Sequence, residues 1–139
     1  MNQRNRDCFD QQVEWILARL PQSVLRLLRE VPLHVEDQPS KQLMRELNID
    51  DAEELCGYFS GVPYSEGGRH FGANVYLAAG VPMSNSITIF RRGIIAASHD
   101  EWGKVKRNSL RVQIRITILH ELAHLHGMED DEIAAIGYG

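Results

Sequence analysis

Two histidines four residues apart, with a glutamate directly after the first, are the residues in this chain that could do chemistry. His120, Glu121 and His124 form the pattern H-E-x-x-H. Because an α-helix advances about 100° and about 1.5 Å per residue, side chains four apart lie about 6 Å from each other on one face. Both imidazoles could therefore bind one metal ion, and Glu121 would lie beside them, within reach of a water on that ion. The pattern predicts metal-assisted hydrolysis, with Zn²⁺ as the metal and Glu121 as the general base.

A third metal ligand is expected shortly after the histidine pair. The pattern continues as H-E-x-x-H-x-x-G-x-x-D, through Gly127 to Asp130. Glycine commonly ends a helix, and a turn at Gly127 would let Asp130 bind the same ion as His120 and His124. The alternative is that Asp130 caps a last short helix over residues 131–136. A catalytic zinc site usually has three protein ligands and a water, and the two histidines supply only two of them. This favours Asp130 as the third ligand, with water in the fourth position. Other carboxylates nearby remain fallback ligands: Glu129, Asp131 and Glu132.

Length and composition fit one globular domain over residues 1–139, with 43% hydrophobic residues. The first residues are polar, and no apolar run approaches the roughly 18 residues needed to cross a bilayer, so we expect a cytoplasmic protein without a membrane partner. The formal charge of −4 argues against nucleic acid as the main partner. Cys8 and Cys56 lie far from the histidines in the sequence and fit reduced thiols.

Helices and one strand are expected in the first part of the chain. Apolar residues at helical spacing predict a helix over residues 6–20, and a second short helix begins at Pro21. Alternation over residues 31–35 predicts a strand whose outer face carries His34 and Glu36. A short helix over residues 40–47 follows, and then a possible capping box before Leu55, formed by Asp50 and Glu53.

The middle of the chain, residues 57–86, is rich in Gly, Pro, Ser and Asn and predicts a long surface loop with little regular structure. Such a loop often borders a site. His70, Tyr64 and Arg69 are therefore candidates for substrate contact, although ordinary loop surface explains them as well. Residues 87–90 alternate as a strand, which residues 94–95 could continue or pair with.

One long helix is predicted from Glu101 through His126, with Asp100 as its cap. Alternating β-branched residues over 112–118 favour a strand instead. We favour the helix, because the histidine pair requires one and because an apolar stripe at helical spacing could bury against the sheet: Val112, Ile116, Leu119 and Ala123.

Basic residues gather in the first half of this predicted helix: Lys104, Lys106, Arg107, Arg111 and Arg115. A solvated helix face is the simplest interpretation. Alternatively, these charges could offset the acidic residues 129–132 or attract an acidic substrate.

The segment H-E-L-A-H-L-H-G-M-E-D at residues 120–130 resembles the zincin-like metallopeptidase family of small bacterial proteins. It is similar more loosely to the metzincins, which have histidine where this chain has Asp130. The resemblance extends to residues 87–92 and to an earlier segment that contains Gly57, Tyr58, Gly61, Val62 and Pro63, so that it covers nearly the whole chain.

The resemblance implies an α+β fold: a minimal zincin-like single domain, with a small mixed sheet packed against helices and a C-terminal active-site helix. It also implies a zinc-dependent peptidase that acts on a peptide or protein substrate, which residues 86–91 would receive as an added β-strand. Two departures are expected: the chain ends at Gly139, without the methionine turn of metzincins, and no Tyr or His stands out to stabilise an oxyanion. The alternative is a catalytically weak or inactive zincin-like module that recognises a protein partner.

Overall fold

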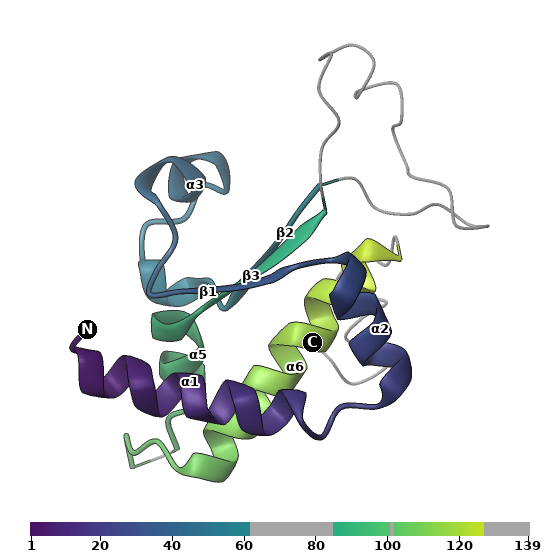
Figure 1. The fold of residues 1–139 in the computed structure, drawn as a ribbon. Helices are drawn as coiled ribbons and strands as arrows, with labels where there is room; N and C mark the ends of the chain where they lie inside the picture. Colours follow the sequence, from purple (N-terminus) through teal and green to yellow (C-terminus); the bar gives the residue numbers. More distant parts are fainter. Residues whose placement is uncertain (62–84, 101, 127–139) are drawn as a thin grey trace.

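The computed structural model describes residues 1–61, 85–100 and 102–126 of the chain (Figure 1). This part has an α+β fold, in which a small mixed sheet packs against helices. The strands are β1 (Leu33–Glu36), β2 (Gly57–Ser60) and β3 (Ser86–Phe90). The helices are α1 (Gln3–Leu17), α2 (Gln22–Glu30), α3 (Lys41–Glu46), the 3₁₀ turn η1 (Ala52–Glu54), α5 (Arg91–Ala97) and α6 (Arg107–Leu125).

Strand β3 lies at the centre of the sheet, in the order β1-β3-β2. It pairs parallel with β1, with Leu33 opposite Ile87, and antiparallel with β2, with Gly57 opposite Ile89. The prediction that residues 86–91 receive a substrate strand is therefore wrong, because both backbone edges of β3 are already paired within the sheet. Among the described residues, β2 forms one edge of the sheet and β1 the other.

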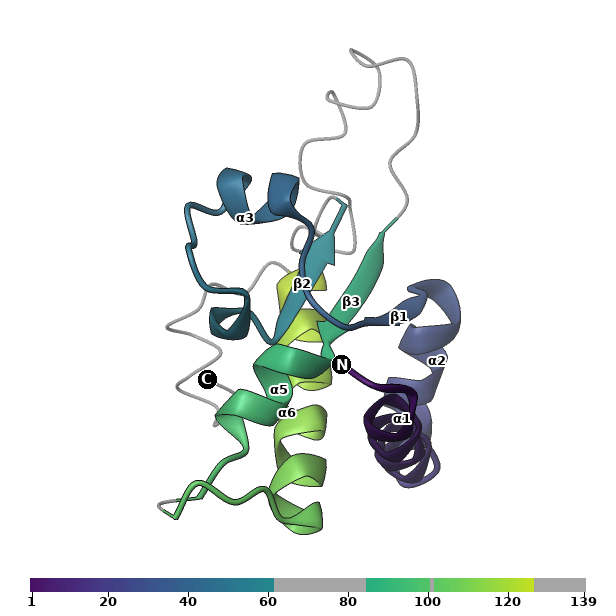
Figure 2. The ribbon, with the colours of Figure 1, turned by 90° about the vertical axis from the view of Figure 1, so that its left-hand side faces the viewer.

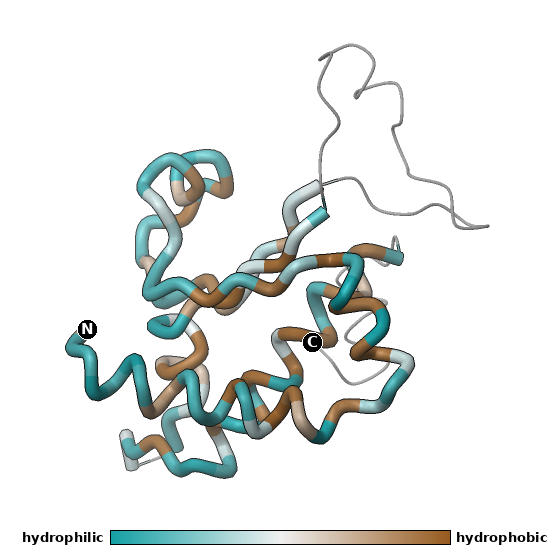
Figure 3. The backbone as a smooth tube through the Cα atoms, viewed as in Figure 1, coloured by the Kyte–Doolittle hydropathy of each residue, from teal (hydrophilic) through white to brown (hydrophobic). Residues whose placement is uncertain are grey.

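Helices α1, α2 and α6 lie on one side of the sheet and enclose the core with it (Figure 1). Apolar residues recur along these helices and along the strands (Figure 3). The most deeply buried include Phe9 from α1, Ile87 and Ile89 from β3, and Ile114 and Ile118 from α6. Figure 2 shows α5 following directly after β3 and lying beside α6.

The predicted apolar stripe on the last helix is correct only toward its C-terminal end, where Leu119 packs against the core and Ala123 is buried. The residues of α6 that enter the core are Ile114, Ile118, Leu122 and Leu125. Of the predicted set, Val112 is exposed and Ile116 and Leu119 are half-buried, whereas Ala123 is buried. Two stripes of α6 are apolar, one through Ile114 and Ile118 and one through Val112 and Ile116, so the sequence pattern alone does not show which of them enters the core.

Three other predictions about local structure need correction. Part of the segment predicted as a loop over 57–86 is strand β2. The residues after β3 form helix α5 rather than more strand. Asp51, not Asp50, caps η1, because its Oδ1 accepts a hydrogen bond from the Glu53 N–H at 2.9 Å.

The beginning of the last helix also differs from the prediction, since α6 starts at Arg107 rather than near 101. Asp100 does not cap it. Instead, the Asp100 Oδ1 accepts hydrogen bonds from the backbone N–H groups of Trp102 and Lys104, both at 2.9 Å, and closes a turn between α5 and α6.

An ion-pair network joins α1 to the sheet and to α5. The Arg91 guanidinium binds Asp10 of α1 at 3.0 Å and Asp37, just after β1, at 2.9 Å. Arg6 also binds Asp37, at 2.7 Å. These arginines hold the pKa of the Asp37 carboxyl below its ordinary value, mainly through the hydrogen bond from Arg6. The network thereby fixes the start of α5 relative to α1.

Candidate active site

Helix α6 carries the histidine pair on a face that points away from the core. The core stripe beginning at Ile114 stabilises the helix through burial, which overrides the local strand preference of its β-branched residues. His120 and His124 lie on another face and are half-buried. Their Nε2 atoms are 3.2 Å apart and their ring centroids 4.9 Å apart. The structure thus brings together the two imidazoles that the sequence pattern predicts.

This spacing fits a shared zinc ion. Two imidazole nitrogens that bind Zn²⁺ at about 2.05 Å in tetrahedral geometry lie about 3.3 Å apart. The observed 3.2 Å between the Nε2 atoms of His120 and His124 is close to that value. The donor pair therefore needs little adjustment to hold the metal.

Glu121 is the third member of this cluster and is 6% exposed. Its Oε1 lies 4.0 Å from the Nε2 of His120, and the ligand atoms of all three residues lie within 4.8 Å of one another. A separation of 4.0 Å exceeds the roughly 3.3 Å expected between two ligands of one tetrahedral zinc ion. It suits a carboxylate that hydrogen-bonds to a water held at the cluster. The geometry therefore favours Glu121 as a base over Glu121 as a ligand.

Asp130, the predicted third ligand, lies outside the described residues, as do the fallback ligands Glu129, Asp131 and Glu132. The same holds for the predicted substrate contacts, Tyr64, Arg69 and His70.

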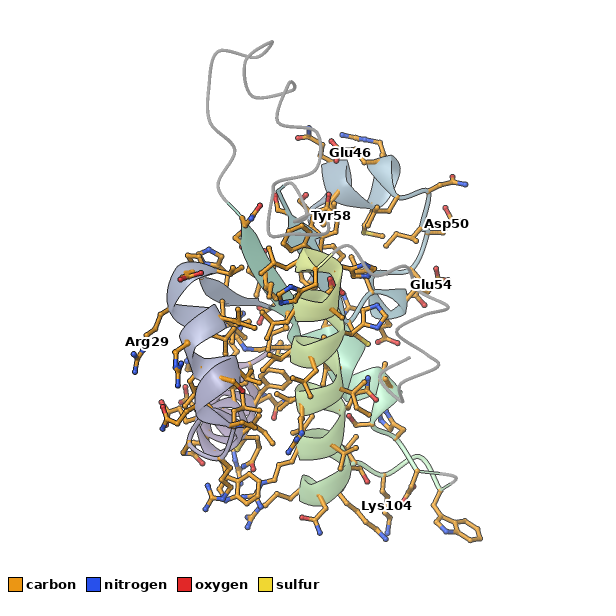
Figure 4. The ribbon with its side chains drawn as sticks, turned by 90° about the vertical axis from the view of Figure 1, so that its right-hand side faces the viewer. Arg29, Glu46, Asp50, Glu54, Tyr58 and Lys104 are labelled. Atoms are coloured by element: carbon orange, nitrogen blue, oxygen red, sulfur yellow. The ribbon has the colours of Figure 1, made fainter. Side chains whose placement is uncertain are left out.

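A cavity of about 610 Å³ opens beside the cluster. One wall is α6, from Gln113 to His124, and the other wall is β2 with the residues just before it. Glu54 and Tyr58 both line this cavity, and Figure 4 shows them beside the upper half of α6. Tyr58 supplies a phenol that sequence reasoning did not identify as a possible oxyanion partner.

Gly57 allows β2 to approach α6 closely at the cluster. A Cβ atom at this position would lie 2.8 Å from the Thr117 Cγ2 and 3.1 Å from the Glu121 Cγ. Contacts under 3.0 Å are essentially never seen for real Cβ atoms. Glycine is therefore required if β2 is to lie directly against Glu121. In the sequence, Gly57 precedes two aromatic residues, and the sequence pattern predicts a loop from this glycine onward, whereas the structure has strand β2 there.

Cys56 also lines the cavity, although it is 64 residues from His120 in the sequence. Burial raises the pKa of its thiol, and the charge of Glu121 raises it further. The thiol therefore stays protonated at neutral pH, which makes it a poor nucleophile.

The sequence profile of the zincin-like metallopeptidase family matches residues 28–139. The chain belongs to this family. A search of curated proteins found no match. The matched range contains all three strands and the whole of α6, and the cluster on α6 is consistent with an H-E-x-x-H site. In the described part of the chain, no helix is both long and apolar enough to cross a membrane.

Proposed function

We propose that this zincin-like protein is a zinc-dependent peptidase. The observation that carries the proposal is the pair of imidazole nitrogens 3.2 Å apart, with the buried carboxylate of Glu121 beside them at the wall of an open cavity. Family membership supports the same activity.

The proposed zinc ligands are His120, His124 and Asp130, with Asp130 assigned from the sequence pattern alone. When bound, zinc would polarise the peptide carbonyl and lower the pKa of a coordinated water to about 7. Glu121 would accept a proton from the attacking water and deliver it to the nitrogen of the leaving amine. The backbone of β2 at Gly57 lies close to the aliphatic stem of Glu121 and to Thr117, which limits the space in which the Glu121 side chain can move.

The peptide substrate would bind along the outer edge of β2. Within the described residues, no strand pairs with this edge, and Gly57, Tyr58 and Phe59 line the cavity. An extended peptide could therefore hydrogen-bond to the backbone of β2 as an added strand and pass over the cluster. The role that the resemblance suggested for residues 86–91 is thus proposed for residues 57–60.

Replacing Glu121 by glutamine tests this proposal, because glutamine keeps the size of the side chain and cannot accept the proton. We expect Glu121→Gln to bind about one zinc ion per chain, like the unmodified protein, and to lose about 100-fold to 10,000-fold in kcat/KM on a cleavable peptide. Asp130→Ala should lose much of the zinc. Zinc content is measured by elemental analysis and hydrolysis by digestion of a peptide library.

Glu54→Gln is the matched control, since Glu54 is an exposed carboxylate on the rim of the same cavity. It should retain both zinc and hydrolysis. The proposal fails if the purified protein binds no zinc at neutral pH, or if Glu121→Gln cleaves as fast as the unmodified protein. Zinc binding without any cleavage would instead support a zincin-like interaction module.

A further inference from the structure

A second recess lies at the other end of α6 from the zinc cluster. It has a volume of about 370 Å³ and is lined by the end of α5 and the first turns of α6, including His99, Ser109 and Val112. Lys104, which belongs to the turn beside this recess, and Tyr58, at the zinc cavity, lie toward opposite ends of α6 in Figure 4. The proposed peptidase site does not use this region.

The turn beside the recess is held in shape by hydrogen bonds and presents a tryptophan to solvent. The Asp100 carboxylate accepts from the backbone N–H groups of Trp102 and Lys104, and the Asp100 N–H donates to the Lys104 carbonyl at 2.8 Å. His99 and Val105 pair as a β-bridge at its base. Trp102 is nevertheless 77% exposed. A fixed turn that exposes an indole is typical of a binding surface rather than of a core element.

Further apolar side chains are exposed around the same recess. Val112 is 57% exposed and Val105 is 37% exposed. Trp102 and Val105 lie on the turn and Val112 lines the recess beside it, and we call these three exposed side chains the Trp102 patch. Exposed apolar residues that gather in one place mark interaction sites more often than residues scattered singly.

A stripe of residues along α6 connects Val112 of the Trp102 patch with the histidines of the cluster. Val112, Ile116, His120 and His124 follow one another at intervals of four residues, so they form a stripe along the helix. Val112 lines the recess, whereas the other three line the zinc cavity. Val112 and His120 are eight positions apart, which corresponds to about 12 Å along the helix. An extended peptide covers that length with about four residues.

The segment that follows Trp102 is basic, whereas Asp100 and Glu101 precede it in the sequence. Residues 104–115 contain five cationic side chains and no acidic one, in a chain whose formal charge is −4. Lys104, Lys106 and Arg107 are exposed, and none of the five makes an ion pair within the described residues. The nearby Asp100 carboxylate is directed at backbone N–H groups. Arg111 is turned toward α1, where it stacks over Trp15 at 3.7 Å.

We propose that the Trp102 patch is an exosite for the peptide substrate. It would bind a large apolar side chain flanked by carboxylates, about four residues from the bond that is cleaved. The inference rests on the proposed peptidase function, because it takes the substrate to be a peptide seated along β2. The apolar anchor would pack against Val112 in the recess and against Trp102 on the turn beside it, and its acidic neighbours would lie near Lys104 and Lys106.

Synthetic peptides test the exosite. Each peptide has a cleavable centre taken from a library hit and carries, four residues away on one side or the other, either Glu-Leu-Glu or Gln-Ser-Gln. Binding is measured by fluorescence anisotropy with zinc-loaded Glu121→Gln protein, so that it does not depend on cleavage. Hydrolysis is measured as kcat/KM with the active protein.

We expect Glu-Leu-Glu on one side to tighten binding and to raise kcat/KM, each about tenfold over Gln-Ser-Gln. Trp102→Ala and the pair Lys104→Glu with Lys106→Glu should abolish the preference while leaving zinc content and thermal stability unchanged, since these side chains are exposed. Lys41→Glu, an exposed charge reversal on α3, is the matched control and should keep the preference.

Equal affinity for the two kinds of peptide would overturn the proposal. A preference for Glu-Leu-Glu that survives Trp102→Ala would also overturn the proposal. The same holds if Trp102 is needed for binding to vesicles containing phosphatidylserine but has no effect on peptide binding, which would assign the patch to an anionic membrane. A preference in binding by a protein that hydrolyses nothing would support docking at the patch and refute the peptidase proposal, which separates the two failures.

Discussion

Replacing Gly57 by alanine should disturb both the packing of β2 against α6 and the position of the base. The added Cβ would lie 2.8 Å from the Thr117 Cγ2 and 3.1 Å from the Glu121 Cγ, whereas ordinary contacts begin near 3.4 Å. The larger shortfall is about 0.6 Å, and it must be relieved by movement of β2 or of α6. Because α6 is held by its core stripe, we expect the movement to fall on β2 and on the two side chains that the new methyl group meets.

Overpacking of this size costs about 1 to 3 kcal/mol of folding free energy. A displacement of 1 Å in an active site costs about 100-fold in rate, so a shift of about half that at Glu121 should lower kcat/KM about tenfold. Thr117→Ser removes the methyl group that is closest to the new Cβ and keeps a hydroxyl for the hydrogen bond to the Gln113 carbonyl. The single variant Thr117→Ser should lose about 1 kcal/mol of folding free energy, because a buried methyl group is removed.

The assay is a double-mutant cycle in chemical denaturation, with zinc content and kcat/KM measured on the same samples. The double variant should be more stable than the sum of the single effects predicts, by about 1 kcal/mol, because the worst contact has been removed. Rescue should be partial, since the contact with Glu121 remains. Strictly additive effects, or a Gly57→Ala protein as stable as the unmodified one, would refute the close approach of β2 to α6.

Three further outcomes follow from charges, thiols and metal. Arg6 and Arg91 lower the pKa of Asp37 in the folded protein, so the ionised Asp37 stabilises the fold fully above the unfolded pKa, and this stabilisation is lost as the pH falls through the folded pKa. In denaturation experiments, Asp37→Asn should therefore be less stable than the unmodified protein at pH 7, and the difference in stability should narrow below about pH 4. A difference that stays constant with pH would contradict this. Cys56 should react with iodoacetamide much more slowly than the exposed Cys8 at pH 8, measured by mass spectrometry, because burial raises its thiol pKa; equal rates would count against its place in the cavity wall. Zinc at 100 times its dissociation constant should stabilise the folded protein by about 2.7 kcal/mol in calorimetry, and an unchanged unfolding temperature would argue against a zinc site in the folded state.

The sequence predicts α6 and its reactive triplet because local spacing is sufficient for both. Histidines four residues apart meet only on a helix, and that requirement correctly outweighed the alternating pattern over residues 112–118. What spacing could not decide was the face that enters the core. Two apolar stripes run along α6, one through Ile114 and Ile118 and one through Val112 and Ile116, and only the packing of the other elements assigns the first to the core.

Neither β2 nor α5 was predicted from the sequence, and each of these elements depends on contacts that are distant in sequence. Gly93 of α5 lies directly against the backbone at Leu55, so closely that a Cβ would collide with the Leu55 carbonyl. Gly57 has a similar role against α6. In the sequence, both glycines indicate turns, because their close neighbours are residues far along the chain. Identifying Cys56 and Tyr58 as cavity residues required the same tertiary information.

Because α6 is anchored through Ile114, Ile118 and Leu122, the separation between the two imidazoles is set by a helix whose opposite side is immobilised. No folding of a loop is needed to bring these two donors together. A metal ion bound at the proposed site would find these two donors already positioned, and its binding would not carry the entropic penalty of ordering the backbone that bears them. The same rigidity should let the protein survive a passing loss of the ion, since the scaffold of the pair is maintained by hydrocarbon packing rather than by the metal.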